Sequence, residues 1–281
     1  MSGILLHPPL WHLLAAALYA ALAVRSWRSR HGLPTLSQAP AGMQSGARAL
    51  LFVALALHGV TLSQELFGVD GMRFGFSLAL SLTLWLALVL YLIESFYARM
   101  EGLQMLGLPL AAVCVLLPAI FPGQHLLFNV DSLAFRAHFL IAMLAYSLFT
   151  LAALHALLMA VAEKRLHRGR MSPLMASLPP LMTMEALLFR LIHVAFLLLT
   201  LTVISGVFFS ESLFGKPLPF DHKTLFAIIA WFIFAALLLG RHLRGWRGRL
   251  ALRWTLAGFI ALLLAYVGSR FVIEVILGRA A

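Results

Sequence analysis

The sequence predicts an all-α protein, a polytopic transmembrane helical bundle of about eight spans with both termini on the outer side of the membrane. Hydrophobic residues make up 62% of the 281 positions and charged residues only 11%, whereas a soluble domain carries roughly 25% charged residues. The apolar residues come in long runs and not in the short alternating segments of a closed barrel. We therefore expect a single integral membrane domain over residues 1–281.

Eight apolar runs approach the length of about 20 residues that crosses a bilayer as a helix. The first begins near Leu10 with no basic residue before it, which indicates a span and not a cleavable signal. The fifth is the longest, and we expect it to tilt or to project from the bilayer. The predicted spans are 9–26, 48–67, 74–94, 104–121, 133–162, 187–209, 222–240 and 251–276.

Lysine and arginine are concentrated in the odd-numbered connections, which hold 15 of the 21 when residues at the span ends are included. Because basic loops stay cytoplasmic, both termini and the 210–222 connection are predicted to face outward. The formal net charge of +11 thus reflects topology and contact with the lipid bilayer. The arginines lie in short turns with no domain large enough to bind a duplex, which excludes nucleic acid as a partner.

The sequence contains no motif that indicates an enzyme. The single cysteine, Cys114, lies within a span and excludes a disulfide framework. There is no hydrolase nucleophile elbow, no zinc-protease helix and no phosphate-binding loop. We therefore expect a protein that binds or carries something and does not catalyse a reaction.

The most informative motif begins just before the seventh span. Phe220-Asp221-His222-Lys223 leads into an apolar helix containing Trp231, and that helix ends in the turn Arg241-His-Leu-Arg-Gly-Trp-Arg-Gly-Arg249. This stretch resembles the tryptophan-rich signature of the cytochrome c assembly protein family, polytopic membrane proteins that handle haem. It is most similar to the divergent HemX-like or YpjD-like branch, and the resemblance covers residues 130–276.

Several positions depart from the family signature. Phe220 and Phe226 stand where the family has tryptophan, and His222 stands where it has proline. The upstream Trp-Gly-x-x-Trp part is missing, because the stretch Ser210–Pro219 contains no tryptophan. Asp221, Lys223, Ala227, Trp231 and the Gly245–Arg249 turn match the family.

The resemblance implies a membrane protein of cytochrome c assembly that binds or hands over haem at the outer face of a bacterial inner (cytoplasmic) membrane, with other assembly proteins as membrane partners. The alternative is a scaffold or regulator, related to haem biosynthesis or to respiratory complexes, that keeps the fold and binds no haem. A solute transporter is disfavoured, since there are no obvious broken-helix repeats.

Two histidines are candidate ligands of the haem iron. The resemblance implies a ligand at His138, because the family places a histidine at the outer end of the span two before its signature span. His222 lies at the outer start of the seventh span, and its depth alone suggests it as the second ligand. The alternative for His138 is a histidine hydrogen-bonded between helices.

The family's second outer ligand follows the span after the signature, and no histidine occupies that region here. Arg270 lies there instead. It could bind a haem propionate, since guanidinium recognises carboxylates well. The favoured interpretation, however, is an i,i+4 helix pair of Arg270 with Glu274.

Further candidate haem-binding residues lie deeper in the membrane or could line the wall of a haem pocket. His58 and His193 would suit a second haem site within the membrane, although a hydrogen bond to a hydroxyl or to the backbone is the favoured role for each. Phe220, Asp221 and Trp231 are candidate cofactor-binding residues, whereas an interfacial aromatic belt would explain the aromatic ones equally well. The arginines of the 241–249 turn are expected to set topology only, and thus to tolerate lysine.

Overall fold

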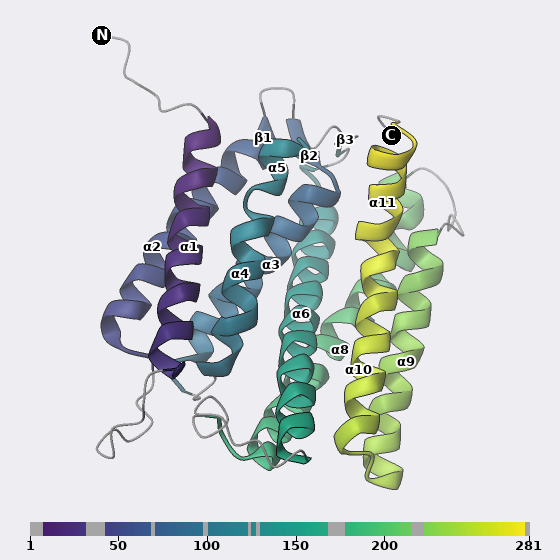
Figure 1. Cartoon of the computed structure of the whole chain (residues 1–281). Coiled ribbons are helices and arrows are strands. Elements are labelled where there is room, and N and C mark those ends of the chain that lie inside the picture. The colour runs from purple at the N-terminus through teal and green to yellow at the C-terminus, as the bar shows by residue number, and fades with distance from the viewer. Residues whose placement is uncertain are drawn as a thin grey trace.

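The described chain is almost entirely helical, as predicted. Figure 1 shows the computed structural model, which describes residues 8–31, 43–68, 71–97, 101–122, 125–127, 130–167, 178–214 and 222–278. Within these ranges, seven helices are long and apolar enough to cross a membrane, and a shorter apolar helix covers Gln104–Ile120. The predicted class, a polytopic helical bundle, is confirmed.

The first half of the chain forms a group of helices around α1 (Pro8–His31). Helix α1 packs against α2 (Ser45–Leu66) and α4 (Gln104–Cys114), and α2 packs against α3 (Phe76–Glu94). Small residues such as Ala54 and Ala111 are fully buried where these helices meet. In a bilayer, such residues let helix backbones approach closely, which compensates for the absence of a hydrophobic driving force.

The fourth predicted span is shorter than the others and is made of two pieces. A 3₁₀ turn, η1 (Glu101–Leu103), leads into α4, and α5 (Leu117–Ile120) follows it. Pro109 lies inside α4 and Pro118 opens α5, and each removes a backbone N–H that a continuous helix needs. In Figure 1, α1 begins at the same end at which α11 stops, so α4 and α5 together make the additional crossing.

A small antiparallel sheet lies at that same end of the molecule (Figure 1). It consists of β1 (Phe67–Gly68), β2 (Gly71–Phe74) and β3 (His125–Leu126), in the order β1-β2-β3. Phe67 pairs with Met72, and Phe74 pairs with His125. We call this end of the molecule the sheet end, and the opposite end, which carries the Arg241–Arg249 turn, the arginine end. No strand was predicted from the sequence at this end.

The second half of the chain forms a closed ring of four helices. They are α6 (Leu133–His167), α8 (Leu181–Phe214), α9 (His222–Arg244) and α10 (Gly248–Leu263). Helix α6 packs against α8, α8 against α9, α9 against α10, and α10 against α6. Phe149 of α6 and Phe234 of α9 are fully buried and stack across this four-helix ring, with ring centroids 3.9 Å apart.

The turn between α9 and α10 is fixed by left-handed glycines and by ion pairs. Gly245 and Gly248 have φ values of +64° and +55°, which other residues adopt only with strain. Arg241 Nη1 lies 2.6 Å from Glu185 Oε1 and donates to the Trp246 carbonyl at 3.1 Å. Its guanidinium lies 4.4 Å from the ring centroid of Phe189. These contacts give Arg241 more than a topogenic role and revise the expectation that lysine is tolerated there.

The last span is not a regular α-helix throughout. After α10 the chain winds through a π-helical stretch, η2 (Leu264–Gly268), a short α11 (Ser269–Phe271) and a second π-helical stretch, η3 (Val272–Ile276). π turns inside α-helices are rare and occur frequently at functional sites. These stretches lie at the sheet end of the four-helix ring.

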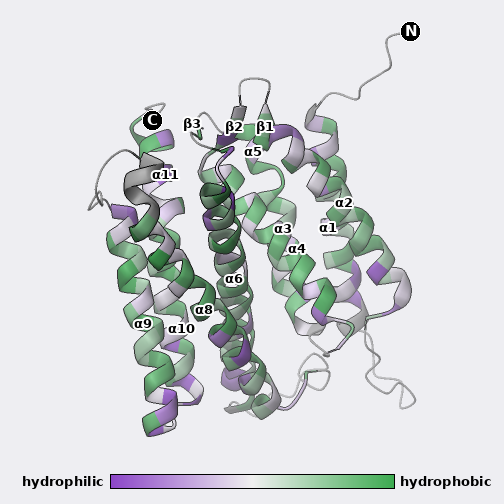
Figure 2. Cartoon of the chain, turned by 180° about the vertical axis from the view of Figure 1, so that it is seen from behind, coloured by the Kyte–Doolittle hydropathy of each residue, from purple (hydrophilic) through white to green (hydrophobic). Residues whose placement is uncertain are grey.

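Apolar side chains cover the outside of the bundle between its two ends. Figure 2 shows hydrophobic residues along the helices and gathers many hydrophilic ones near the ends. Exposed side chains such as Phe52, Leu197 and Phe232 are unfavourable in water and suit lipid. Arg25, at the far end of α1, lies at the arginine end, as the predicted topology requires. The chain is therefore a multi-pass membrane protein.

Candidate functional site

The sheet end of the four-helix ring brings together three of the side chains singled out from the sequence. Helices α6 and α9 begin there, and α8 and the last span end there. His138 comes from α6, His222 from α9 and Arg270 from α11. Residues far apart in the sequence therefore lie at the same end of the four-helix ring. We call this end, with His138, His222 and Arg270, the mouth of the ring.

His138 is partly buried and is held against α8 by a hydrogen bond. Its Nδ1 lies 2.8 Å from Oγ of Ser205, whose hydroxyl donates to the Thr202 carbonyl at 3.1 Å. The Ser205 hydroxyl has one proton to donate, so where it donates to Thr202 the imidazole Nδ1 carries a proton and donates it to Ser205. Nε2 of His138 is then left with a lone pair. Metal-binding histidines are oriented in this manner, with one ring nitrogen donating to a fixed acceptor.

His222 is the exposed first residue of α9, the helix diagonal to α6. The level of α9 against α8 is set by Trp231, whose Nε1 donates to Thr200 Oγ1 at 2.9 Å. Ser205 lies five residues above Thr200, and His222 lies nine residues above Trp231, toward the sheet end. At about 1.5 Å per residue, His222 lies about 6 Å nearer the sheet end than the level of His138.

Arg270 and His138 lie at a similar depth. The hydroxyl of Tyr146 donates to the Leu262 carbonyl at 3.0 Å and fixes the register of α6 against α10. His138 lies eight residues from Tyr146 toward the sheet end, and Arg270 lies eight residues from Leu262 in the same direction. His138 therefore lies about 12 Å above that contact, and Arg270 lies at a similar but slightly smaller height, because the π-helical η2 rises less per residue than an α-helix. Neighbouring packed helices are about 8–10 Å apart, a gap that one haem can bridge.

The favoured interpretation of Arg270, an i,i+4 ion pair with Glu274, is wrong. Among the described residues no ion pair within 4.0 Å joins the two; Glu274 Oε2 instead accepts the backbone N–H of Phe76 at 3.2 Å. The physical reason is the π-helical winding, whose hydrogen-bond repeat of five residues takes positions 270 and 274 out of α-helical register. Arg270 is 6% exposed.

Trp231 lies inside the ring wall, well below the start of its helix. Its indole packs 5.5 Å from the ring of Phe196 on α8 and donates to Thr200. It is therefore placed as a wall residue between α8 and α9 and not in an interfacial belt. Phe226 is partly buried on the same helix. The predicted residues Phe220 and Asp221 lie outside the described residues.

The hypothesis of a deep haem site formed by His58 and His193 is wrong as a pairing. His58 is fully buried, with Nδ1 3.1 Å from the Tyr19 hydroxyl and Nε2 2.9 Å from Ser81 Oγ, so neither nitrogen is available to a metal. His58 lies on α2 and His193 on α8. Helices α3 and α6 lie between these two, because α2 packs against α3, α3 against α6 and α6 against α8. The exposed His193 lies 2.6 Å through Nδ1 from the Phe189 carbonyl.

Sequence reasoning did not identify Ser205 or Tyr266, both of which contact predicted site residues. Ser205 orients His138, and the guanidinium of Arg270 lies 6.0 Å from the ring centroid of Tyr266. A signal for each exists in the sequence. Ser205 is one of three hydroxyl-bearing residues, with Thr200 and Thr202, in a mostly apolar run, and Tyr266 lies four residues before Arg270, within helical reach.

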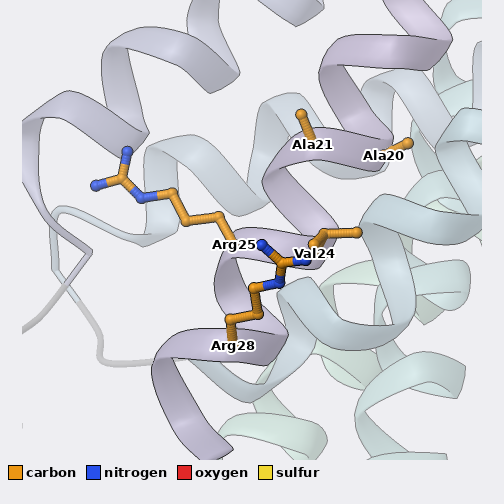
Figure 3. Close-up of a pocket in the computed structure, with 5 residues that line it drawn as sticks. All are labelled: Ala20, Ala21, Val24, Arg25 and Arg28. Carbon is orange, nitrogen blue, oxygen red and sulfur yellow. The ribbon is translucent and has the colours of Figure 1, made fainter. Parts of the chain in front are cut away.

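A hollow on the surface lies in the other half of the molecule. It is lined by residues of α1 toward the arginine end, where two guanidinium groups flank small apolar side chains (Figure 3): Ala20, Ala21, Val24, Arg25 and Arg28. Arg25 donates to Gln44 Oε1 at 2.9 Å. Helix α1 packs against α2 and α4, so this hollow is separate from the mouth of the four-helix ring.

Comparison with known proteins agrees with the motif at residues 220–249. The family model described as "Cytochrome C assembly protein" matches residues 45–277, which extends the resemblance to the second helix. "Inner membrane protein YpjD" of Escherichia coli (strain K12) is 28% identical over 249 residues, covering 87% of this chain and 92% of that protein.

Two further relatives match shorter stretches. An uncharacterised 28.8 kDa protein of Azospirillum brasilense is 34% identical over 143 residues, 50% of this chain and 52% of that protein. "Cytochrome c biogenesis protein CcsA" of Gloeobacter violaceus is 35% identical over 92 residues, 33% of this chain and 27% of that protein. No solved structure matches the chain.

Proposed function

The chain belongs to the cytochrome c assembly protein family, and from this premise we propose that it binds haem at the sheet end of its four-helix ring for use in cytochrome c assembly. His138 would hold the iron through Nε2. His222, on the diagonal helix, would be the second ligand. Other membrane proteins of cytochrome c assembly deliver or receive the haem.

The orientation of His138 is the observation that carries this proposal. Its Nδ1 is engaged by the Ser205 hydroxyl at 2.8 Å, which leaves Nε2 as the ring atom that can turn to a metal. Imidazole nitrogen is the commonest protein ligand of haem iron. The residues present also fit the rest of the group, because a haem is apolar over its macrocycle and anionic at its propionates, while the ring wall is aromatic and carries a buried arginine.

Haem, when bound, would supply an iron that accepts one or two imidazoles. The chain's own residues orient the ligand histidine and fix the helices around it. Ser205 and Thr202 fix the tautomer and the ring plane of His138. Trp231 and Phe196 hold the wall between α8 and α9, and Thr200 fixes the indole by accepting its N–H.

We place the protein in a bacterial inner membrane, with the sheet end outward. The E. coli relative is named an inner membrane protein, and the basic connections lie at the arginine end. Single cysteines at Asp131 and Lys164, in a Cys114→Ser background, test the orientation, because both positions are exposed at opposite ends of α6. We expect an impermeant thiol reagent to label Asp131→Cys in intact spheroplasts and Lys164→Cys only after lysis. The reverse pattern would put the mouth on the cytoplasmic side.

The spectrum of the purified protein tests haem binding. We expect wild-type protein to show a Soret band with bis-histidine character, and His138→Ala and His222→Ala each to shift or weaken it because one iron–imidazole bond is lost. Added imidazole should partly restore the band. Ser205→Ala, which removes only the orienting acceptor, should lower haem affinity by about 10- to 100-fold.

His242→Ala is the matched control, since His242 is exposed on the same helix as His222 but at the arginine end. It should leave the spectrum unchanged. A wild-type protein that is colourless and takes up no added haem would overturn the proposal and leave the scaffold or regulator as the function. A wild-type spectrum in His138→Ala would exclude this histidine as the ligand.

A further inference from the structure

The last span carries a cluster of buried polar atoms that the protein itself does not satisfy. Six buried side-chain nitrogen or oxygen atoms of the described residues lack a hydrogen-bond partner, and four of them belong to three residues one turn apart: the Tyr266 hydroxyl, Arg270 Nε and Nη1, and Glu274 Oε1. A buried donor left without a partner is destabilising, and more so when it is charged. Such a concentration indicates that a partner from outside the chain completes the cluster.

The carboxylate of Glu274 does not fill this role for Arg270. Its Oε2 accepts the first backbone N–H of α3, from Phe76, where a carboxylate also stabilises the positive end of the helix. The approach is close, because a Cβ at Gly75 would lie 2.8 Å from that same oxygen. Glu274 is therefore committed to joining the last span to α3.

The charge of the cluster favours an anion. The Lys223 ammonium, from the first turn of α9, lies 5.7 Å from the ring centroid of Tyr266, and the Arg270 guanidinium lies 6.0 Å from it. Two cations thus lie near one aromatic ring, together with the carboxylate of Glu274. A carboxylate ligand would meet the guanidinium with two parallel hydrogen bonds and would take the Tyr266 hydroxyl as a third donor.

The position of the cluster identifies which anion. Arg270 lies at a depth similar to that of His138 on a neighbouring helix, by the Tyr146–Leu262 register. Packed aromatic rings join α6 to the last span: Phe139, next to His138 in the chain, lies 5.1 Å from Phe74, and Phe74 lies 5.4 Å from Tyr266. A ligand that carries a metal and a carboxylate on one flat apolar body would meet His138 with the metal and Arg270 with the carboxylate.

We propose that Tyr266 and Arg270 form the carboxylate half of the haem site and bind one haem propionate. This inference rests on the proposed function, because it takes haem as the ligand of the mouth. Among the described residues no ion pair within 4.0 Å joins Arg270 to Glu274, and Arg270 Nε and Nη1 have no hydrogen-bond partner, so both atoms can receive a ligand. Haem is thus held at its iron by α6 and at its edge by the last span.

Haem and haem dimethyl ester separate the two halves of the site, because the ester has the same iron and macrocycle but no propionate charge. Each is titrated into purified wild-type protein, Arg270→Gln and Arg136→Gln. We expect wild-type protein to bind haem about tenfold or more tighter than the ester, as a charged hydrogen bond of about 1.5–3 kcal/mol implies. Arg270→Gln should lose this preference and keep the Soret position, because the iron ligands are untouched.

Arg136→Gln is the matched control. Arg136 also lies at the sheet end but is 64% exposed and is paired with Asp131, so its loss tests whether general positive charge suffices. It should keep the full preference for haem. Equal wild-type affinity for haem and ester, or a preference that Arg270→Gln retains, overturns the inference and leaves the haem function intact. Failure of wild-type protein to bind either compound overturns the proposed function itself.

Discussion

The two ends of the four-helix ring each hold an arginine beside an aromatic ring and a carboxylate, with opposite outcomes. At the arginine end, Arg241 lies 2.6 Å from Glu185, donates to the Trp246 carbonyl and packs over Phe189. At the sheet end, Arg270 is more deeply buried, yet its Nε and Nη1 have no partner. The same residue types therefore build a closed structural contact in one place and an incomplete one in the other.

The comparison distinguishes residues that stabilise the fold from residues that are available to bind a ligand. A buried charge that is fully paired is costly to disturb, because removing one partner strands the other. A buried charge without partners contributes little to the fold and persists where it has another use. Substitutions at the two ends should accordingly change stability in opposite directions.

The largest effect is expected at Glu185, which accepts from both Arg241 and Arg247. Glu185→Ala should destabilise the protein by about 2–3 kcal/mol, because it leaves a partly buried guanidinium unpaired. The midpoint of thermal unfolding in detergent measures this. The matched control is Glu163→Ala, whose partner Arg249 is 62% exposed; it should cost about 0–1 kcal/mol. Equal losses in the two variants would mean that burial does not distinguish these pairs.

A smaller loss is expected when Arg241 is replaced by lysine. Lysine keeps the charge but loses the planar stacking on Phe189 and one of the two hydrogen bonds, which should cost about 1–2 kcal/mol. The same unfolding midpoint reports it. Arg244→Lys, at an exposed position of the same turn, should change the midpoint very little. If both variants behave like wild type, the turn sets topology only.

The smallest effect, and one of opposite sign, is expected at Arg270. Arg270→Met replaces a buried charge that lacks partners with an apolar side chain of similar length, so the haem-free protein should be unchanged or more stable by up to about 1 kcal/mol. Thermal unfolding of haem-free protein checks it. A loss of more than about 1 kcal/mol would show that Arg270 has a structural partner after all, and the contrast between the two ends would disappear.

The course of the chain through the membrane could be predicted from the sequence because it depends on local quantities. Apolar run length located all seven long helices, and the tightly packed α6 is the longest of them, as the fifth run indicated. The distribution of arginine predicted that both ends of the chain lie on one side, which matches the arrangement of α1 and α11 in Figure 1. The fourth span covers Gln104–Ile120, close to the predicted 104–121, but it is divided into α4 and α5, with Pro118 at the start of the second piece.

Contacts between distant segments could be predicted only where a family motif marked them. His138 was found through its place in the motif, but its acceptor Ser205 lies 67 residues away and no local pattern joins them. The pairing of β2 with β3 likewise joins short segments about fifty residues apart. The Arg270–Glu274 pair was predicted from α-helical spacing and failed, because spacing alone does not indicate where a helix changes to π winding.

The stacked Phe149 and Phe234 have a consequence for traffic through the molecule. With ring centroids 3.9 Å apart and no exposed surface, they close the axis of the four-helix ring about 16 Å below His138, at 1.5 Å per residue. The ring is therefore closed along its axis at this level. A ligand that binds near His138 has to arrive from the sheet end or sideways between the helices, and not along the axis from the arginine end.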